Sequence, residues 1–73
     1  MKKNEQGMMA TVADILTQRA QNDSLKGTAL LTLAAQVRRG ETSLYLVNGL
    51  LMGFDHNPIP KIDEYFRRQA ACA

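Results

Sequence analysis

The sequence contains almost none of the residues by which very small proteins reinforce a fold. Its 73 residues include one cysteine, Cys72, and one histidine, His56, so the chain can form no internal disulfide and cannot supply the four ligands of a structural zinc site. A domain of this size buries only about 60% of the surface that its unfolded chain exposes. We therefore expect the protein to self-associate, and the lone thiol favours a reducing cytoplasm.

Catalytic groups are equally scarce. Nucleophilic catalysis requires a nucleophile beside a base, and the single histidine, His56, follows Asp55 in a segment predicted to be a loop. We interpret both as solvated loop residues and Cys72 as inert. The segment Gly49–Gly53 lacks the lysine of a phosphate-binding loop. The sequence therefore predicts a protein that is not an enzyme, with no catalytic residue, no metal and no cofactor.

Strong charge and long apolar runs are also missing. Nine basic residues are interspersed with seven acidic ones, and the net charge of +2 argues weakly against a dedicated nucleic-acid-binding protein. The longest uncharged stretch, residues 42–54, has 13 residues, whereas a membrane-spanning helix needs about 20. We expect a cytoplasmic protein without a membrane span.

What the sequence does contain is helical periodicity. Residues 1–7 are polar and lack a pattern, so we expect a flexible N-terminus followed by a single helical domain over residues 8–73. Apolar residues three and four apart predict a helix from Met8 or Met9 to Ala20 and another over residues 25–39. Gly40 indicates where the second helix ends. The predicted fold is all-α, a small bundle of three to four short helices. The residues expected to face its core are Met9, Val12, Ala13, Leu16, Ala20, Leu30, Leu33, Ala34 and Val37.

Residues 42–55 allow two interpretations. As a helix, the segment is capped by Thr42 or Ser43 and places five apolar residues on one face. These are Leu44, Val47, Leu50, Leu51 and Phe54. As a hairpin, it turns at Asn48-Gly49 and gives an α+β fold. Strict alternation of apolar and polar residues fails on both sides of that turn, so we favour the helix.

A last short helix is predicted over residues 60–70, after a loop that contains both prolines. Asp63 and Glu64 come early in it and Arg67 and Arg68 come late, which suits the helix dipole. Tyrosine and arginine are enriched at binding hot spots. We therefore expect this helix to present a partner-facing surface of Tyr65, Phe66, Arg67 and Arg68.

The segment 42–54 carries the functional hypothesis. A helix that is apolar all round must be covered all round, and a chain this small has too few other helices to cover it. We therefore expect a small regulatory or inhibitory protein that binds another protein, such as a larger regulator, without covalent chemistry. The predicted interface consists of Leu46, Leu50, Met52, Phe54, Tyr65, Arg67 and Arg68.

The alternative is a helix-turn-helix transcriptional regulator that binds DNA. In that case residues 25–39 form the recognition helix, because residues 42–54 carry no charge with which to contact phosphates. The side chains available for the contact are Lys26, Thr28, Thr32, Gln36 and Arg39. The sparse charge of this helix makes nucleic acid the weaker of the two hypotheses.

Overall fold

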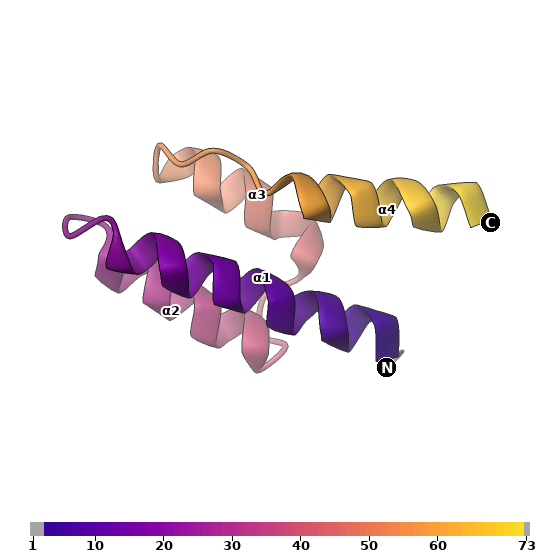
Figure 1. The fold of residues 1–73 in the computed structure, drawn as a ribbon, viewed down its shortest axis with the longest axis horizontal. Coiled ribbons are helices and arrows are strands. Elements are labelled where there is room, and N and C mark those ends of the chain that lie inside the picture. The colour runs from indigo at the N-terminus through magenta and orange to yellow at the C-terminus, as the bar shows by residue number, and fades with distance from the viewer. Residues whose placement is uncertain (1–2, 73) are drawn as a thin grey trace.

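The computed structural model describes residues 3–72, which form four α-helices and no strand (Figure 1). The helices are α1 (Lys3–Gln21), α2 (Gly27–Arg38), α3 (Leu44–Gly53) and α4 (Pro60–Cys72). The all-α prediction is confirmed and the hairpin alternative is wrong, because Asn48 and Gly49 lie in the middle of α3. Residues 1, 2 and 73 lie outside the described residues.

The helices form two antiparallel pairs along an elongated body of 40 × 21 × 16 Å (Figure 1). α1 and α2 pack against each other along their length, and α4 runs back beside α1 and α3. The core between them is wholly aliphatic. It contains every residue predicted for α1 and α2, together with Leu44, Val47, Leu51, Ile59 and Ile62.

The first two helices begin at residues other than those predicted. α1 starts at Lys3, so residues 3–7 are helical and not a separate polar lead. α2 starts at Gly27 and not at Leu25, because a carboxylate oxygen of Asp23 accepts the N–H groups of Leu25 and Lys26, each at 3.1 Å, and holds them in a turn. Gly27 is required there, since a Cβ atom would lie 2.9 Å from the carbonyl oxygen of Ala20 in α1.

α2 and α3 end in the same hydrogen-bonded motif. Gly40, with φ of 74°, follows α2 as predicted, and the N–H of Glu41 bonds to the carbonyl of Gln36 at 2.8 Å. α3 repeats the motif with Asp55 at φ of 60°, a conformation that is unfavourable for a residue with a side chain. The N–H of His56 then bonds to the carbonyl of Leu51 at 2.9 Å. Both helices therefore stop sharply and turn the chain back.

Asn48 joins α3 to the start of α4. Its Oδ1 accepts the N–H of Ile59 at 2.7 Å, and its Nδ2 donates to the carbonyl of Ile59 at 3.2 Å. The same Nδ2 lies 3.3 Å from an oxygen of Asp63. These bonds fix the segment that inserts Ile59 and Ile62 into the core. The asparagine that suggested a hairpin turn therefore serves as a link between helices.

Candidate protein-binding surface

The apolar residues of α3 divide between the core and the surface. Leu44, Val47 and Leu51 are buried. The other large side chains are exposed, with exposed fractions of 77% for Tyr45, 55% for Leu46, 42% for Leu50 and 65% for Met52. Leu50 shares its predicted face with the buried residues but lies at the edge of that face, about 100° around the helix from Leu51, and it is exposed. Leu46, Leu50 and Met52 of the predicted interface therefore reach solvent.

Two glycines lie at the centre of this exposed side. A Cβ atom added at Gly49 or Gly53 would meet no atom within 4 Å. At 3.6 residues per turn, Leu46 and Leu50 border the glycines on one side, and Tyr45 and Met52 border them on the other. We call this surface the outer face of α3. It consists of Tyr45, Leu46, Gly49, Leu50, Met52 and Gly53, and none of these residues is charged.

A groove of about 520 Å³ separates α3 from α4 and begins at the edge of the outer face. Tyr45 of α3 and Phe66 of α4 meet edge to face across it, with ring centroids 6.1 Å apart. Ile62 lies at its base, and Asp63 and Arg67 add one charge of each sign. We call it the α3–α4 groove. Its lining combines an aromatic pair with polar groups that can orient a partner.

The four residues predicted to form one surface on α4 are divided between two sides of the helix. Phe66 and Arg67 line the α3–α4 groove, whereas Tyr65 and Arg68 line a hollow of about 260 Å³ next to Met8 of α1. Tyr65 is half-buried and packs against the core. The rings of Tyr65 and Phe66 still meet edge to face, with centroids 5.3 Å apart, but the four side chains point in several directions, because successive residues on a helix are 100° apart.

The arginines of α4 differ in their pairing. Arg68 forms an ion pair of 2.7 Å with Glu64, one turn earlier. Among the described residues Arg67 has no ion-pair partner, so its guanidinium remains available at the groove. Phe54, the remaining member of the predicted interface, is half-buried and packs against the core. Of the three aromatic residues predicted to contact a partner, Phe54 and Tyr65 are half-buried and Phe66 is exposed.

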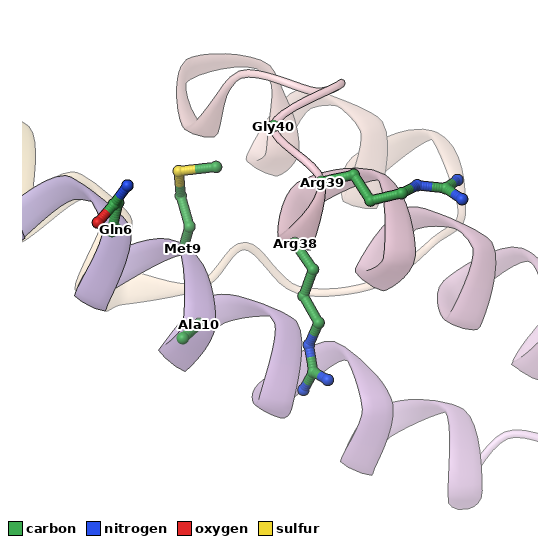
Figure 2. A pocket seen from close by; sticks show the side chains of 6 residues that line it. All are labelled: Gln6, Met9, Ala10, Arg38, Arg39 and Gly40. Atoms are coloured by element: carbon green, nitrogen blue, oxygen red, sulfur yellow. The ribbon is translucent and has the colours of Figure 1, made fainter. Parts of the chain in front are cut away.

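The second pair of arginines, at the end of α2, is neutralised within the chain. Figure 2 shows a hollow of about 310 Å³ between α1 and the end of α2, with Arg38 reaching toward α1 and Arg39 pointing away. Arg38 pairs with Asp14 of α1, and Arg39 pairs with Glu41 at 3.3 Å. These exposed pairs contribute little stability, but they compensate both charges. The hollow is therefore a poor site for an anion.

Polar side chains connect the two loops at the opposite end of the molecule. His56 Nε2 lies 2.8 Å from Asp23 Oδ2, and its side chain is only 17% exposed. Lys26 Nζ lies 3.3 Å from Asp55 Oδ2 and also donates to the carbonyl of Phe54. The interpretation of His56 as a solvated loop residue is therefore wrong, since the ring fastens the α3–α4 loop to the α1–α2 turn. The hydrogen bond from His56 is the main cause that lowers the pKa of Asp23 below its usual value.

Within residues 3–72, no helix has both the length and the apolar character that crossing a bilayer requires. No three acidic, histidine or cysteine side chains gather as a metal site in the described part of the chain, and the thiol of Cys72 lies outside that part. Comparison of the chain with protein-family models, curated proteins and solved structures found no match. The surface itself therefore carries the functional argument.

Proposed function

We propose that this is a small regulatory or inhibitory protein that acts by binding another protein non-covalently through the α3–α4 groove. The observation that carries the proposal is the continuous apolar surface from the outer face of α3 into the groove, joined at Tyr45. Contiguous exposed apolar patches mark contact sites in soluble proteins. On this proposal the pair of Asp23 and His56 has a structural role, and the protein carries out no reaction of its own.

The lining of the groove supports a polypeptide partner over a small molecule. The groove is lined by side chains of two helices, α3 and α4, and grooves between helices receive amphipathic helices in other proteins. Its more exposed aromatic residue, Tyr45, and Arg67, which has no ion-pair partner among the described residues, are residue types in which binding energy is usually concentrated. Asp63 on the same wall would disfavour a strongly acidic partner. We therefore propose a partner segment with an apolar face and mixed charge at its edges.

The test compares partner capture by three forms of the protein. The double variant Phe66→Ala, Arg67→Ala removes the groove contacts, and Arg68→Ala is the matched control, because Arg68 lies on the opposite side of α4. We expect a set of host proteins captured by the unmodified protein and by the control to be lost with the double variant, before and after nuclease treatment. Equal capture by all three forms would exclude the groove as the binding site.

The DNA-binding alternative is a second proposal, which rests on the outward side of α2. Thr28, Thr32 and Arg39 are exposed there. Three observations weigh against it. Lys26 is engaged by the α3–α4 loop, and Arg39 is paired with Glu41. Leu31, half exposed, lies near the residues that would contact phosphates. A DNA complex should weaken steeply as salt increases, because bound counterions are released. Binding to duplex DNA with that dependence, abolished by Arg39→Ala, would favour this alternative.

A further inference from the structure

We infer that a second copy of the chain covers the outer face of α3, in a two-fold dimer whose α3 helices cross at Gly49 and Gly53. This inference goes beyond the proposed function, because it concerns the side of α3 that carries Leu46 and Leu50 and leaves the α3–α4 groove open. The two surfaces share only Tyr45, at their border. Three observations support a second copy as the occupant: surface area, charge and the position of the glycines.

The surface area is larger than a monomer of this mass requires. The chain exposes 5070 Å², whereas a compact monomer of 8.1 kDa exposes about 4500 Å². The radius of gyration of 12.1 Å also exceeds the value of about 11 Å for a compact domain of this length. The excess of roughly 600 Å² per chain, counted for two chains, reaches about 1200 Å², the lower limit of a standard specific interface.

The charge distribution favours self-association over a strongly charged partner. An interface with two-fold symmetry places identical surfaces against each other, so a surface with a net charge repels its own copy. The outer face of α3 avoids this repulsion, because residues 42–54 are uncharged. An acidic or basic partner would find no counter-charge on it.

Neither glycine of α3 is needed for a close contact among the described residues; Gly49 lies inside the helix and Gly53 is its last residue. Gly27 is needed for the close approach to Ala20, and Gly40 for its positive φ, but Gly49 and Gly53 have ordinary helical backbone and open space around them. A glycine inside a helix is less stable than alanine would be. Two of them one turn apart let a second helix approach closely, and Leu46 and Leu50 beside them are large enough to pack over the opposing backbone.

The mass of the protein in solution tests the inference directly. Sedimentation equilibrium of the full chain should give about twice 8.1 kDa at high concentration. Leu46→Glu and Leu50→Glu should each raise the dissociation constant at least tenfold. Leu31→Glu is the matched control, since Leu31 is equally exposed but lies on α2. A monomer at every concentration, or equal disruption by the control, would overturn the inference.

A second measurement decides the question even where a variant fails to fold. The melting temperature of the unmodified dimer should rise with protein concentration, whereas that of a monomer should not change. The double variant Phe66→Ala, Arg67→Ala separates this inference from the proposed function. It should lose the partner protein and still dimerise. If capture through the groove persists while no dimer forms, only the dimer is wrong.

Discussion

The α1–α2 pair and α3 differ in how many of their apolar residues are buried. In the pair, the apolar stripe of each helix is buried, and most residues on the outward side are polar or small. The two helices therefore cover most of each other's apolar surface. α3 buries Leu44, Val47 and Leu51 and exposes Tyr45, Leu46 and Met52. Apolar side chains favour burial in both regions. The chain buries most of them in the α1–α2 pair but leaves several on α3 exposed. This contrast is the basis of the proposal that another molecule covers the outer face of α3.

The two regions also differ in what holds them in place. The α1–α2 pair is held by continuous apolar packing and by the close approach at Gly27. α3 depends more on polar links at fixed points: Ser43 caps its first turn, Asn48 binds Ile59, and His56 binds Asp23 beyond its end. Hydrogen bonds depend on direction, so these bonds help to orient α3 with its outer face toward solvent.

The largest expected effect comes from a core leucine of the pair. Leu16→Ala should lower the free energy of unfolding by about 2–5 kcal/mol, because Leu16 is fully buried and the change leaves a cavity. Leu46→Ala, the same change on the outer face of α3, should alter the stability of the monomer by less than about 0.5 kcal/mol. Chemical denaturation at low protein concentration measures both. Similar losses in the two variants would contradict the division between core and outer face.

Glycine substitutions should give effects of opposite sign. Gly27→Ala should destabilise the protein by about 1–3 kcal/mol, because the new Cβ would press on the carbonyl of Ala20. Gly49→Ala should stabilise the monomer by up to about 1 kcal/mol, since the helix gains alanine's higher propensity at no steric cost. The second measurement is made with Leu46→Glu present, so that dimerisation does not contribute. A loss of stability there would reveal a contact that Gly49 makes within the chain.

A loss of similar size to that of Gly27→Ala is expected from breaking the link between α3 and α4. Asn48→Ala removes both bonds to the backbone of Ile59 and should cost about 1–3 kcal/mol, since the N–H and carbonyl lie beside a buried side chain. Hydrogen exchange should increase in α4 first, because the link fixes the start of that helix. Asn57→Ala is the control in the same loop. Unchanged exchange in α4 would show that the apolar contacts of Ile59 and Ile62 hold the helix by themselves.

The parts of the fold that follow from local periodicity could be predicted, and the parts set by distant contacts could not. The inner residues of α1 and α2 repeat at helical spacing, and Gly40 marks a helix end by its own backbone preference. Asn48 is typical of a hairpin turn, but in the structure it bonds to Ile59, 11 positions later, and a local pattern cannot show that contact. The role of His56 depends on Asp23, 33 positions earlier in the chain. No local pattern predicts either bond.

The candidate surface shows the same limit. The excess of apolar residues in 42–54 predicted that part of this segment would remain exposed. Which residues do so depends on the rotation of α3 about its axis, and that rotation is set by Asn48 and by the loop that follows. The sequence correctly predicts that Leu50 is exposed, but it also predicts partner contacts for Phe54 and Tyr65, and both are half-buried against the core. The composition of residues 42–54 predicts an exposed apolar surface, but contacts between distant residues determine which side chains form it.

The smallest expected effect concerns the pair of Asp23 and His56, and it depends on pH. The bond to His56 lowers the pKa of Asp23 in the folded protein, so the ionised carboxylate contributes stability above its unfolded pKa of about 3.9. That contribution disappears as the pH falls through the lower, folded-state pKa. Asp23→Asn keeps an oxygen to accept the N–H groups of Leu25 and Lys26 but loses the charge. We therefore expect it to be less stable than the unmodified protein at pH 6, and the difference to shrink in strong acid.

The titration of Asp23 itself isolates the contribution of His56. The carboxyl carbon of Asp23, followed by NMR, should titrate at a higher pH in His56→Ala than in the unmodified protein, because the main cause of the lowered pKa is gone. The bonds from Leu25 and Lys26 remain in that variant and also lower the pKa, so the shift should be partial. The control is Asp14→Asn, which breaks the distant pair with Arg38 and should leave the titration of Asp23 unchanged. If Asp23 titrates alike with and without His56, the turn alone sets its pKa, and the link between the two loops contributes nothing to its ionisation.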